Sequence, residues 1–341
     1  MNRWLCLCLL AASGGTIPVL AVAESATTTP FPDKETVSTS AANQGSFNRS
    51  ESSSWLDKSH AYASRSTDSL ANWIDNFFGV PRADIESAYT SLRLSFDNEW
   101  EESVGNDTNV RLRGKVHLPR INERLSLIFT DDEGSDGDKV DTGISAVTGK
   151  KENTKVGLQY NIQDEKRSRL DFSVGMRSSF KGKANMRYRY ELPWGELLTN
   201  RFTETLYFVD GEGFGVRSSY DLDRTIDENR LLRWANNLKF SEDTNGVQWS
   251  TRLLMGERLN EKSAISYFVW TGGETRPDYL TTSYGLGMRY RRTFFRPWLF
   301  YELEPAYAWK REEIEDNREG VAIFTARIEV NLERLRQSKT D

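Results

Sequence analysis

Histidine is the side chain most often used as a general base, and the chain carries two, His60 and His117. Hydrolysis of an ester or amide needs such a base beside an activated serine, cysteine or water. His60 lies in or near a polar segment before a predicted helix, and His117 lies in the alternating segment VRLRGKVHL. Neither histidine has a serine or aspartate at a spacing typical of a catalytic motif. We therefore assign no catalytic residue.

Metal and cofactor chemistry finds little support in the sequence. The stretch DDEGSDGDKVDTG is rich in aspartate, but counted from Asp132 its third and twelfth positions are Gly134 and Gly143, where an EF-hand needs oxygen ligands. Cys6 and Cys8 both lie in the first 23 residues, so no thiolate site is expected beyond them. No glycine-rich loop follows a strand and opens a helix. We predict a solvated loop, no metal site and no cofactor.

Charged and apolar side chains alternate over long stretches of the chain. In MRYRYELPW, residues 186–194, Arg187, Arg189 and Glu191 share one parity, while methionine, tyrosine, leucine and tryptophan share the other. Successive side chains of a β-strand point to opposite faces, so each such segment predicts a strand with one apolar and one charged face. From about Ala88 to the end, about 14 segments read this way, separated by turn signals such as DGEG and EDTNG.

The two faces indicate a membrane-spanning β-barrel more than a soluble sandwich. If the charged parity of residues 186–194 faced lipid, each basic group near the midplane would cost about 2–4 kcal/mol, so the apolar parity must face out. Aromatic side chains near the predicted strand ends form two girdles, as expected at the two membrane interfaces. One girdle contains Trp100, Phe208, Trp270 and Trp309, and the other contains Trp194, Phe294, Phe295 and Trp298.

The inward parity is predicted to be rich in charge, with basic groups in excess. The basic residues singled out are Arg111, Arg113, Lys115, Arg187, Arg189, Arg289 and Arg291, and the acidic ones are Glu191, Glu302 and Glu304. Two interpretations stay open. The arginines pair with carboxylates of neighbouring strands in a closed network, or their excess faces water and favours anionic solutes in a channel.

The region before the strands divides into three predicted segments. Residues 1–23 are typical of a secretory signal peptide, and 24–54 of a flexible Ser/Thr-rich linker. Residues 55–87 form a helical segment, predicted to be periplasmic. Its apolar stripe has helical spacing and consists of Leu70, Trp73, Ile74, Phe77 and Phe78. This stripe packs on the rest of the protein, or it docks on a membrane surface or a periplasmic partner.

Taken together, residues 88–335 resemble Gram-negative outer-membrane β-barrel proteins as a class, by alternation, girdles, loop lengths and signal peptide. The resemblance implies an all-β fold: an antiparallel transmembrane barrel of about 12–14 strands over 88–341, preceded by a short amphipathic helix. It implies an outer-membrane location in contact with lipid and lipopolysaccharide, with the N-terminus in the periplasm. Nucleic acid is not an expected partner, because the basic groups line a concave interior and the pI is about 5.5.

Three functions are compatible with this sequence. The leading hypothesis is a porin-like channel, not an enzyme, that passes small polar and in particular anionic solutes. The second is a plugged barrel with a structural or partner-docking role through the 70–78 helix. The third is a barrel-wall enzyme that modifies lipid, for which His117 is the one base available on the barrel.

Overall fold

The computed structural model describes residues 70–79, 90–119, 121–122, 124–131, 154–177, 181–195, 197–242, 246–276, 278–311 and 313–332. The predicted signal peptide, the predicted linker and the Asp132 loop lie outside these residues. Within them the chain forms one helix at 70–78 and 14 strands. None of the described helical residues forms a span long and apolar enough to cross a bilayer.

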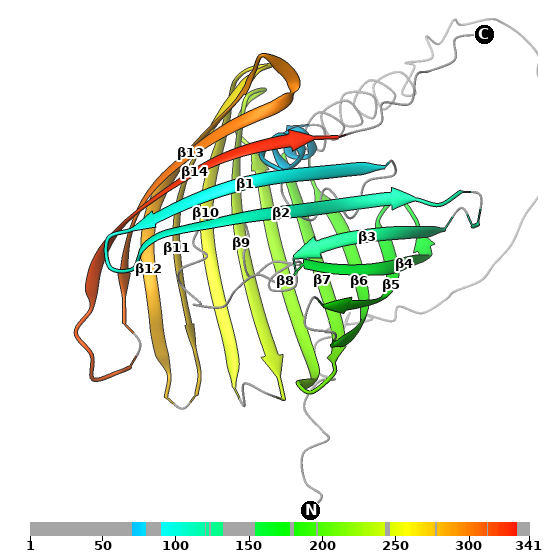
Figure 1. Cartoon of the computed structure of the whole chain (residues 1–341), viewed down its shortest axis with the longest axis horizontal. Coiled ribbons are helices and arrows are strands. Elements are labelled where there is room, and N and C mark those ends of the chain that lie inside the picture. Colours follow the sequence, from blue (N-terminus) through cyan, green and yellow to red (C-terminus); the bar gives the residue numbers. More distant parts are fainter. Residues whose placement is uncertain are drawn as a thin grey trace, which may run out of the picture. The chain divides into compact units, whose positions relative to one another are not determined.

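The strands form one closed antiparallel barrel in which each strand pairs with its neighbours in sequence and β1 pairs with β14 (Figure 1). Their bounds are β1 Ser91–Glu101, β2 Gly105–His117, β3 Leu125–Asp131, β4 Thr154–Asp164, β5 Ser168–Arg177, β6 Gly182–Trp194, β7 Leu198–Val209, β8 Gly213–Thr225, β9 Arg230–Ser241, β10 Val247–Asn260, β11 Ser263–Glu274, β12 Leu280–Phe294, β13 Arg296–Lys310 and β14 Glu319–Asn331. The predicted architecture is confirmed, at the upper end of the predicted strand number.

An even number of strands brings the start of β1 and the end of β14 to the same end of the barrel, here called the terminal end. The pairing of Arg93 with Asn331 lies there, and that of Glu101 with Ile323 lies at the far end. Connections at the terminal end are short, for example residues 226–229 between β8 and β9, whereas residues 132–153 between β3 and β4 belong to the far end.

Alternation along the strands sorts the side chains between the two faces as predicted. In β6 the apolar Met186, Tyr188 and Tyr190 are exposed on the outer face, while Arg187 between them is buried. The same outer parity exposes large apolar side chains on the other strands, among them Phe96, Val174, Leu206, Leu238, Leu286 and Ile328. The exposed apolar side chains of this closed wall match a lipid surround.

One predicted girdle residue is wrong. Trp270 is only 8% exposed and packs inside the barrel, in a cluster of Leu254, Phe268, Trp270, Ala306, Ala308, Val321 and Ile323. Its strand, β11, has apolar residues on both parities, so alternation does not reveal which parity faces lipid. The neighbouring strand β12 presents Gly285 and Gly287 to the interior, and the rings of Trp270 and Phe268 occupy the space that side chains there would fill.

The 70–78 helix packs against the inner wall of the barrel. Its apolar residues Leu70, Ala71, Ile74, Phe77 and Phe78 form one buried cluster with Leu231 of β9, Ala264 of β11 and Phe300 of β13, and Trp73 packs on its edge. The sequence predicts a separate helical segment over 55–87, and the described part of that segment lies within the lumen at the terminal end.

Candidate functional site in the lumen

The predicted lumen residues lie on the inner wall of the barrel. Arg113, Lys115, Arg187, Arg289, Arg291, Glu302 and Glu304 are buried, and Arg111, Arg189 and Glu191 are partly buried. Arg289 and Arg291 are 0% exposed, so both guanidinium groups have lost their contact with bulk water. A cation that is fully desolvated needs carboxylates close by, and the wall provides them.

A continuous network of ion pairs crosses the seam where β14 meets β1. Glu329 of β14 accepts hydrogen bonds from Arg93 at 3.0 Å and from Arg291 at 2.5 Å. Arg291 also contacts Glu302 at 3.2 Å, and Arg327 donates to the second oxygen of Glu302 at 2.6 Å. The network therefore joins β12, β13, β14 and β1 through alternating charges.

Two extensions continue this network along the wall. Asp97 of β1 pairs with Arg327 and accepts a hydrogen bond from Arg111 of β2 at 2.6 Å. On the other side, Arg289 pairs with Glu304 and lies 3.5 Å from Glu302. Of the two interpretations of the inward charges, cross-strand pairing describes this part of the wall.

Smaller groups of ion pairs occupy the opposite wall. Arg169 donates to Asp171 at 2.8 Å, and Arg187 lies 3.5 Å from the same carboxylate oxygen. Arg201 donates to Glu191 at 2.6 Å, and Arg189 lies 3.7 Å from it. In both groups two guanidinium groups lie close to the same carboxylate.

The helix is anchored to the wall by a buried carboxylate. Asp75 contacts Nη1 of Arg233 at 2.5 Å and Nη2 at 3.3 Å. The same guanidinium donates to both oxygens of Asp223, through Nε at 2.6 Å and Nη2 at 2.7 Å. Bidentate pairs between arginine and carboxylate are directional as well as strong, so this contact fixes the position of the helix around its axis.

Two inward arginines, Arg93 of the network and Arg113 of β2, bind the C-terminal end of the helix. Nη2 of Arg93 donates to the carbonyl oxygen of Asn76 at 2.8 Å, and Nη2 of Arg113 donates to that of Gly79 at 3.3 Å. The last carbonyl groups of a helix lack partners within the helix and carry its partial negative charge, so cations there are favourable. Gly79 has a φ of +66°, and a Cβ at this residue would lie 3.0 Å from Arg93. Glycine suits this position because it adopts a positive φ without strain and has no Cβ to crowd Arg93.

The apolar side of the helix fits the wall residue by residue. The rings of Phe77 and Phe300 meet edge to face with centroids 5.6 Å apart. A Cβ added to Gly256 of β10 would lie 3.2 Å from Cδ1 of Ile74, so the missing side chain makes room for the helix. The guanidinium of Arg258 lies 5.2 Å from the ring centroid of Trp73. The predicted docking face of the helix is thus occupied by the barrel's own wall.

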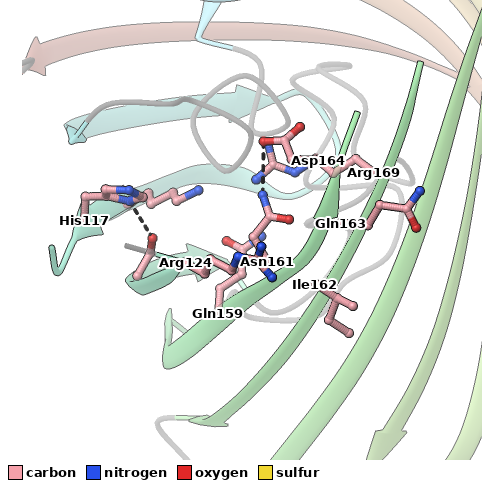
Figure 2. Close-up of a pocket in the computed structure, with 10 residues that line it drawn as sticks. His117, Arg124, Gln159, Asn161, Ile162, Gln163, Asp164 and Arg169 are labelled. Atoms are coloured by element: carbon pink, nitrogen blue, oxygen red, sulfur yellow. Dashed lines mark hydrogen bonds and ion pairs between the residues drawn. The ribbon is translucent and has the colours of Figure 1, made fainter. Parts of the chain in front are cut away.

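A polar pocket of about 480 Å³ lies at the terminal end, between β2 and β5 (Figure 2). Its lining includes Lys115 and His117 at the end of β2, Arg124 before β3, Asp164 at the end of β4 and Arg169 near the start of β5. Ser126, Gln159, Asn161, Ile162 and Gln163 complete it. This cavity is in the size range of sites for small ligands.

His117 and Ser126 face each other in this pocket. Nδ1 of His117 lies 2.9 Å from Oγ of Ser126, and their strands pair at these two residues. A serine beside a histidine is the start of a nucleophilic site, but Ser126 is only 1% exposed. The pair also faces the lumen, whereas the acyl chains of membrane lipid would contact the outer face. The geometry therefore does not favour the lipid-modifying enzyme of the third hypothesis.

Sequence reasoning did not single out Asp75, Arg169, Arg201 or Asp223 as site residues. For Arg169 and Arg201 a signal is present in the sequence, because each lies two residues from another inward polar residue, Asp171 and Thr203 respectively. For Asp75 the signal was weaker: it is a carboxylate at the edge of an apolar stripe. Among the described residues, no cluster of histidine, cysteine, aspartate and glutamate has the arrangement of a metal site.

Comparison with known proteins gives likeness in structure only. No protein-family model and no curated protein matches the chain. Solved structures that are similar include OprD of Pseudomonas aeruginosa, at 10% identity and a TM-score of 0.42, covering 74% of this chain and 96% of that one. OprB of Pseudomonas putida has 11% identity and a TM-score of 0.42, with 71% and 91% covered. A KdgM porin in complex with oligogalacturonate has 7% identity and a TM-score of 0.36, with 70% and 98% covered.

Likeness of this extent carries no argument about solutes or function. The architecture stands on the chain's own residues: 14 antiparallel strands closed into a barrel, apolar side chains on the outer face and paired charges within. Such a wall places its charges away from lipid. This architecture is that of outer-membrane β-barrel proteins, the class that the sequence resembles.

Proposed function

We propose that the protein is an outer-membrane channel for small polar solutes, with a preference for anions. The observation that carries the proposal is the opposite character of the two faces of one closed wall, apolar outside and charged inside. On the inner face of β5, β6 and β7 the basic side chains outnumber the carboxylates, which makes this side of the lumen positive. The basic residues are Arg169, Lys183, Arg187, Arg189 and Arg201, and the carboxylates are Asp171 and Glu191. Positive charge on a pore wall attracts anions and repels cations.

We also infer that the 70–78 helix controls the opening of this channel. It occupies part of the lumen at the terminal end, where Asp75, Asn76 and Gly79 are held by arginines of the wall. Besides its apolar packing on the wall, the helix is held by these few polar contacts, and it has no strand pairing to lose. A helix held in this way can leave the wall while the barrel stays closed.

The terminal end is assigned to the periplasm. Outer-membrane barrels have short periplasmic turns and longer loops outside the cell. Here the turns at the terminal end are short, such as residues 261–262 between β10 and β11, and the longest connection, residues 132–153, belongs to the far end. The far end would then contact lipopolysaccharide, and the N-terminus would lie in the periplasm.

The test is ion selectivity of the folded protein in planar bilayers across a KCl gradient. The proposal expects discrete conductance steps and a reversal potential of the sign for chloride preference. Arg189→Glu changes a partly exposed inward residue and should move the reversal potential toward potassium. Arg224→Glu, on the outer face at the same end of the barrel, is the matched control and should not. Anion preference would be refuted if the unaltered protein preferred cations, or if the two variants changed the reversal potential equally.

The lodged helix favours one second candidate, a barrel that is permanently plugged and has a structural or docking role. In that case folded protein, recognised by a band on SDS gels that shifts on boiling, would show no conductance even after the helix is loosened. A periplasmic partner that binds the apolar stripe of the helix would first have to displace it from Phe300 and Leu231. Docking is therefore proposed only for a released helix.

A further inference from the structure

The helix and the polar pocket divide the terminal end of the lumen between them. The helix contacts Arg233 of β9, Arg258 of β10, Phe300 of β13, Arg93 of β1 and Arg113 of β2. The pocket is lined from β2 to β5 (Figure 2), and β9 and β10 are on the opposite side of the barrel. A solute that enters at this end while the helix is docked therefore meets the pocket side of the wall.

The charges around the pocket suit a single negative charge. Three cationic side chains line it, Lys115, Arg124 and Arg169, against one carboxylate, Asp164. Asp164 lies 3.8 Å from Nη1 of Arg169 and accepts a hydrogen bond from Asn161 at 3.1 Å. Arg169 is 5% exposed and holds Asp171 through its Nε, so its position is fixed by the wall. Arg124 is exposed and free to turn toward a ligand.

Apart from Ile162, the remaining lining consists of polar groups that can hydrogen-bond to hydroxyls. Gln159 is 2% exposed, and its Oε1 atom has no hydrogen-bond partner among the described residues. An orphaned acceptor in such a place costs free energy unless a donor from water or a ligand reaches it. The side-chain amides of Asn161 and Gln163 can both donate and accept hydrogen bonds, so they match the hydroxyl groups of a polyol.

We propose that this pocket is a binding site for small hydroxylated carboxylates, which are monoanions of the sugar-acid type. The carboxylate would lie among Lys115, Arg124 and Arg169, and the hydroxyls would reach Gln159 and Asn161. The proposal rests on the proposed function in one respect: the pocket would be the place where a permeating solute pauses beside the docked helix. Binding itself does not require conduction, so the two can be tested separately.

The experiment is calorimetric titration of the folded full-length protein in detergent with gluconate, and with sorbitol as the uncharged polyol of the same carbon number. Gluconate should bind and sorbitol should bind at least about tenfold more weakly, because one charge-assisted contact is worth roughly that factor. Arg124→Gln removes an exposed cation without altering the wall and should weaken gluconate binding about tenfold. Lys115→Gln should do the same from inside the pocket.

Arg224→Gln is the matched control, because it removes one arginine at the same end of the barrel on the outer face and should leave binding unchanged. Equal weakening in Arg224→Gln and Arg124→Gln would overturn the site, as would binding that sorbitol shares or no binding at all by folded protein. If gluconate binds as expected but no conductance is ever seen, the site stands and the channel fails. If conductance is seen without gluconate binding, the channel stands and the binding site fails.

Discussion

The guanidinium of Arg233 lies between two carboxylates, Asp223 of the neighbouring strand and Asp75 of the helix, with Asp75 at 2.5 Å from its Nη1 atom. Arg233 and Asp75 are 158 residues apart in sequence. Arg233 therefore has a partner in the wall whether or not the helix is docked. This relationship makes the helix contact reversible, because release of Asp75 does not leave a buried cation without a carboxylate.

Asp75→Asn should release the helix without unfolding the barrel. Replacing the carboxylate weakens a hydrogen bond between charged groups, worth roughly 1.5–3 kcal/mol, which changes the ratio of docked to released helix about ten- to hundredfold. We expect a higher open probability in single-channel recordings. Asn72→Ala, on the exposed side of the same helix, should not alter it. An Asp75→Asn protein with unchanged gating would show that the helix does not control the pore.

Glu302→Gln should destabilise the barrel strongly. Glu302 is 2% exposed and holds both Arg291 and Arg327, so its neutralisation leaves two buried cations with one carboxylate fewer. Breaking a buried ion pair by removing one partner costs about 3–5 kcal/mol. Urea unfolding in lipid vesicles, followed by tryptophan fluorescence, measures this loss. Arg230→Gln removes an exposed pair with Asp227 and should cost less than about 1 kcal/mol.

An arginine introduced on the outer face should destabilise the barrel more at the middle of the membrane than near its surface. Tyr188 is at the middle of β6 and Leu192 is near its end, and both point outward. Tyr188→Arg should cost about 2–4 kcal/mol of stability in vesicles, and Leu192→Arg should cost about 0–1 kcal/mol, since the penalty falls toward the interface. The same urea titration measures both. Equal costs at the two positions would contradict the assignment of this face to lipid.

The fold was largely predictable because most strands contrast chemically between their faces. In β6 a one-residue shift would turn the inward Arg187 and Arg189 toward lipid in place of Tyr188 and Tyr190. The free-energy cost of arginine in lipid is therefore enough to determine which face of the strand points inward. In β11 no such contrast exists: Phe268 faces inward and Val269 faces outward. A one-residue shift there moves apolar side chains from one apolar environment to another. The alternation pattern therefore does not determine which residues of β11 face inward.

The candidate site was less predictable, because its parts are distant in sequence. The apolar stripe of the helix indicates that it needs an apolar partner but does not indicate which surface provides one. Its docking depends on Phe300 and on the absence of a side chain at Gly256, and neither has a local signal. The pocket likewise combines Lys115, Gln159 and Arg169 of three strands, whose register one sequence does not fix.

The glycines of β12 provide a test of the inward apolar cluster that alternation missed. A Cβ at Gly287 would lie 2.6 Å from the ring of Phe268, which is closer than real contacts allow, and 3.1 Å from Cβ of Ala306. Gly287→Ala should therefore destabilise the barrel by about 1–3 kcal/mol, the usual cost of overpacking. Adding Phe268→Leu should recover part of that loss, because the shorter side chain makes room for the new methyl group. Phe268→Leu alone should be destabilising, since it leaves a cavity over Gly287. Additive losses in the double variant would mean that the two residues do not share one packing site, which would contradict the contact between Phe268 and Gly287.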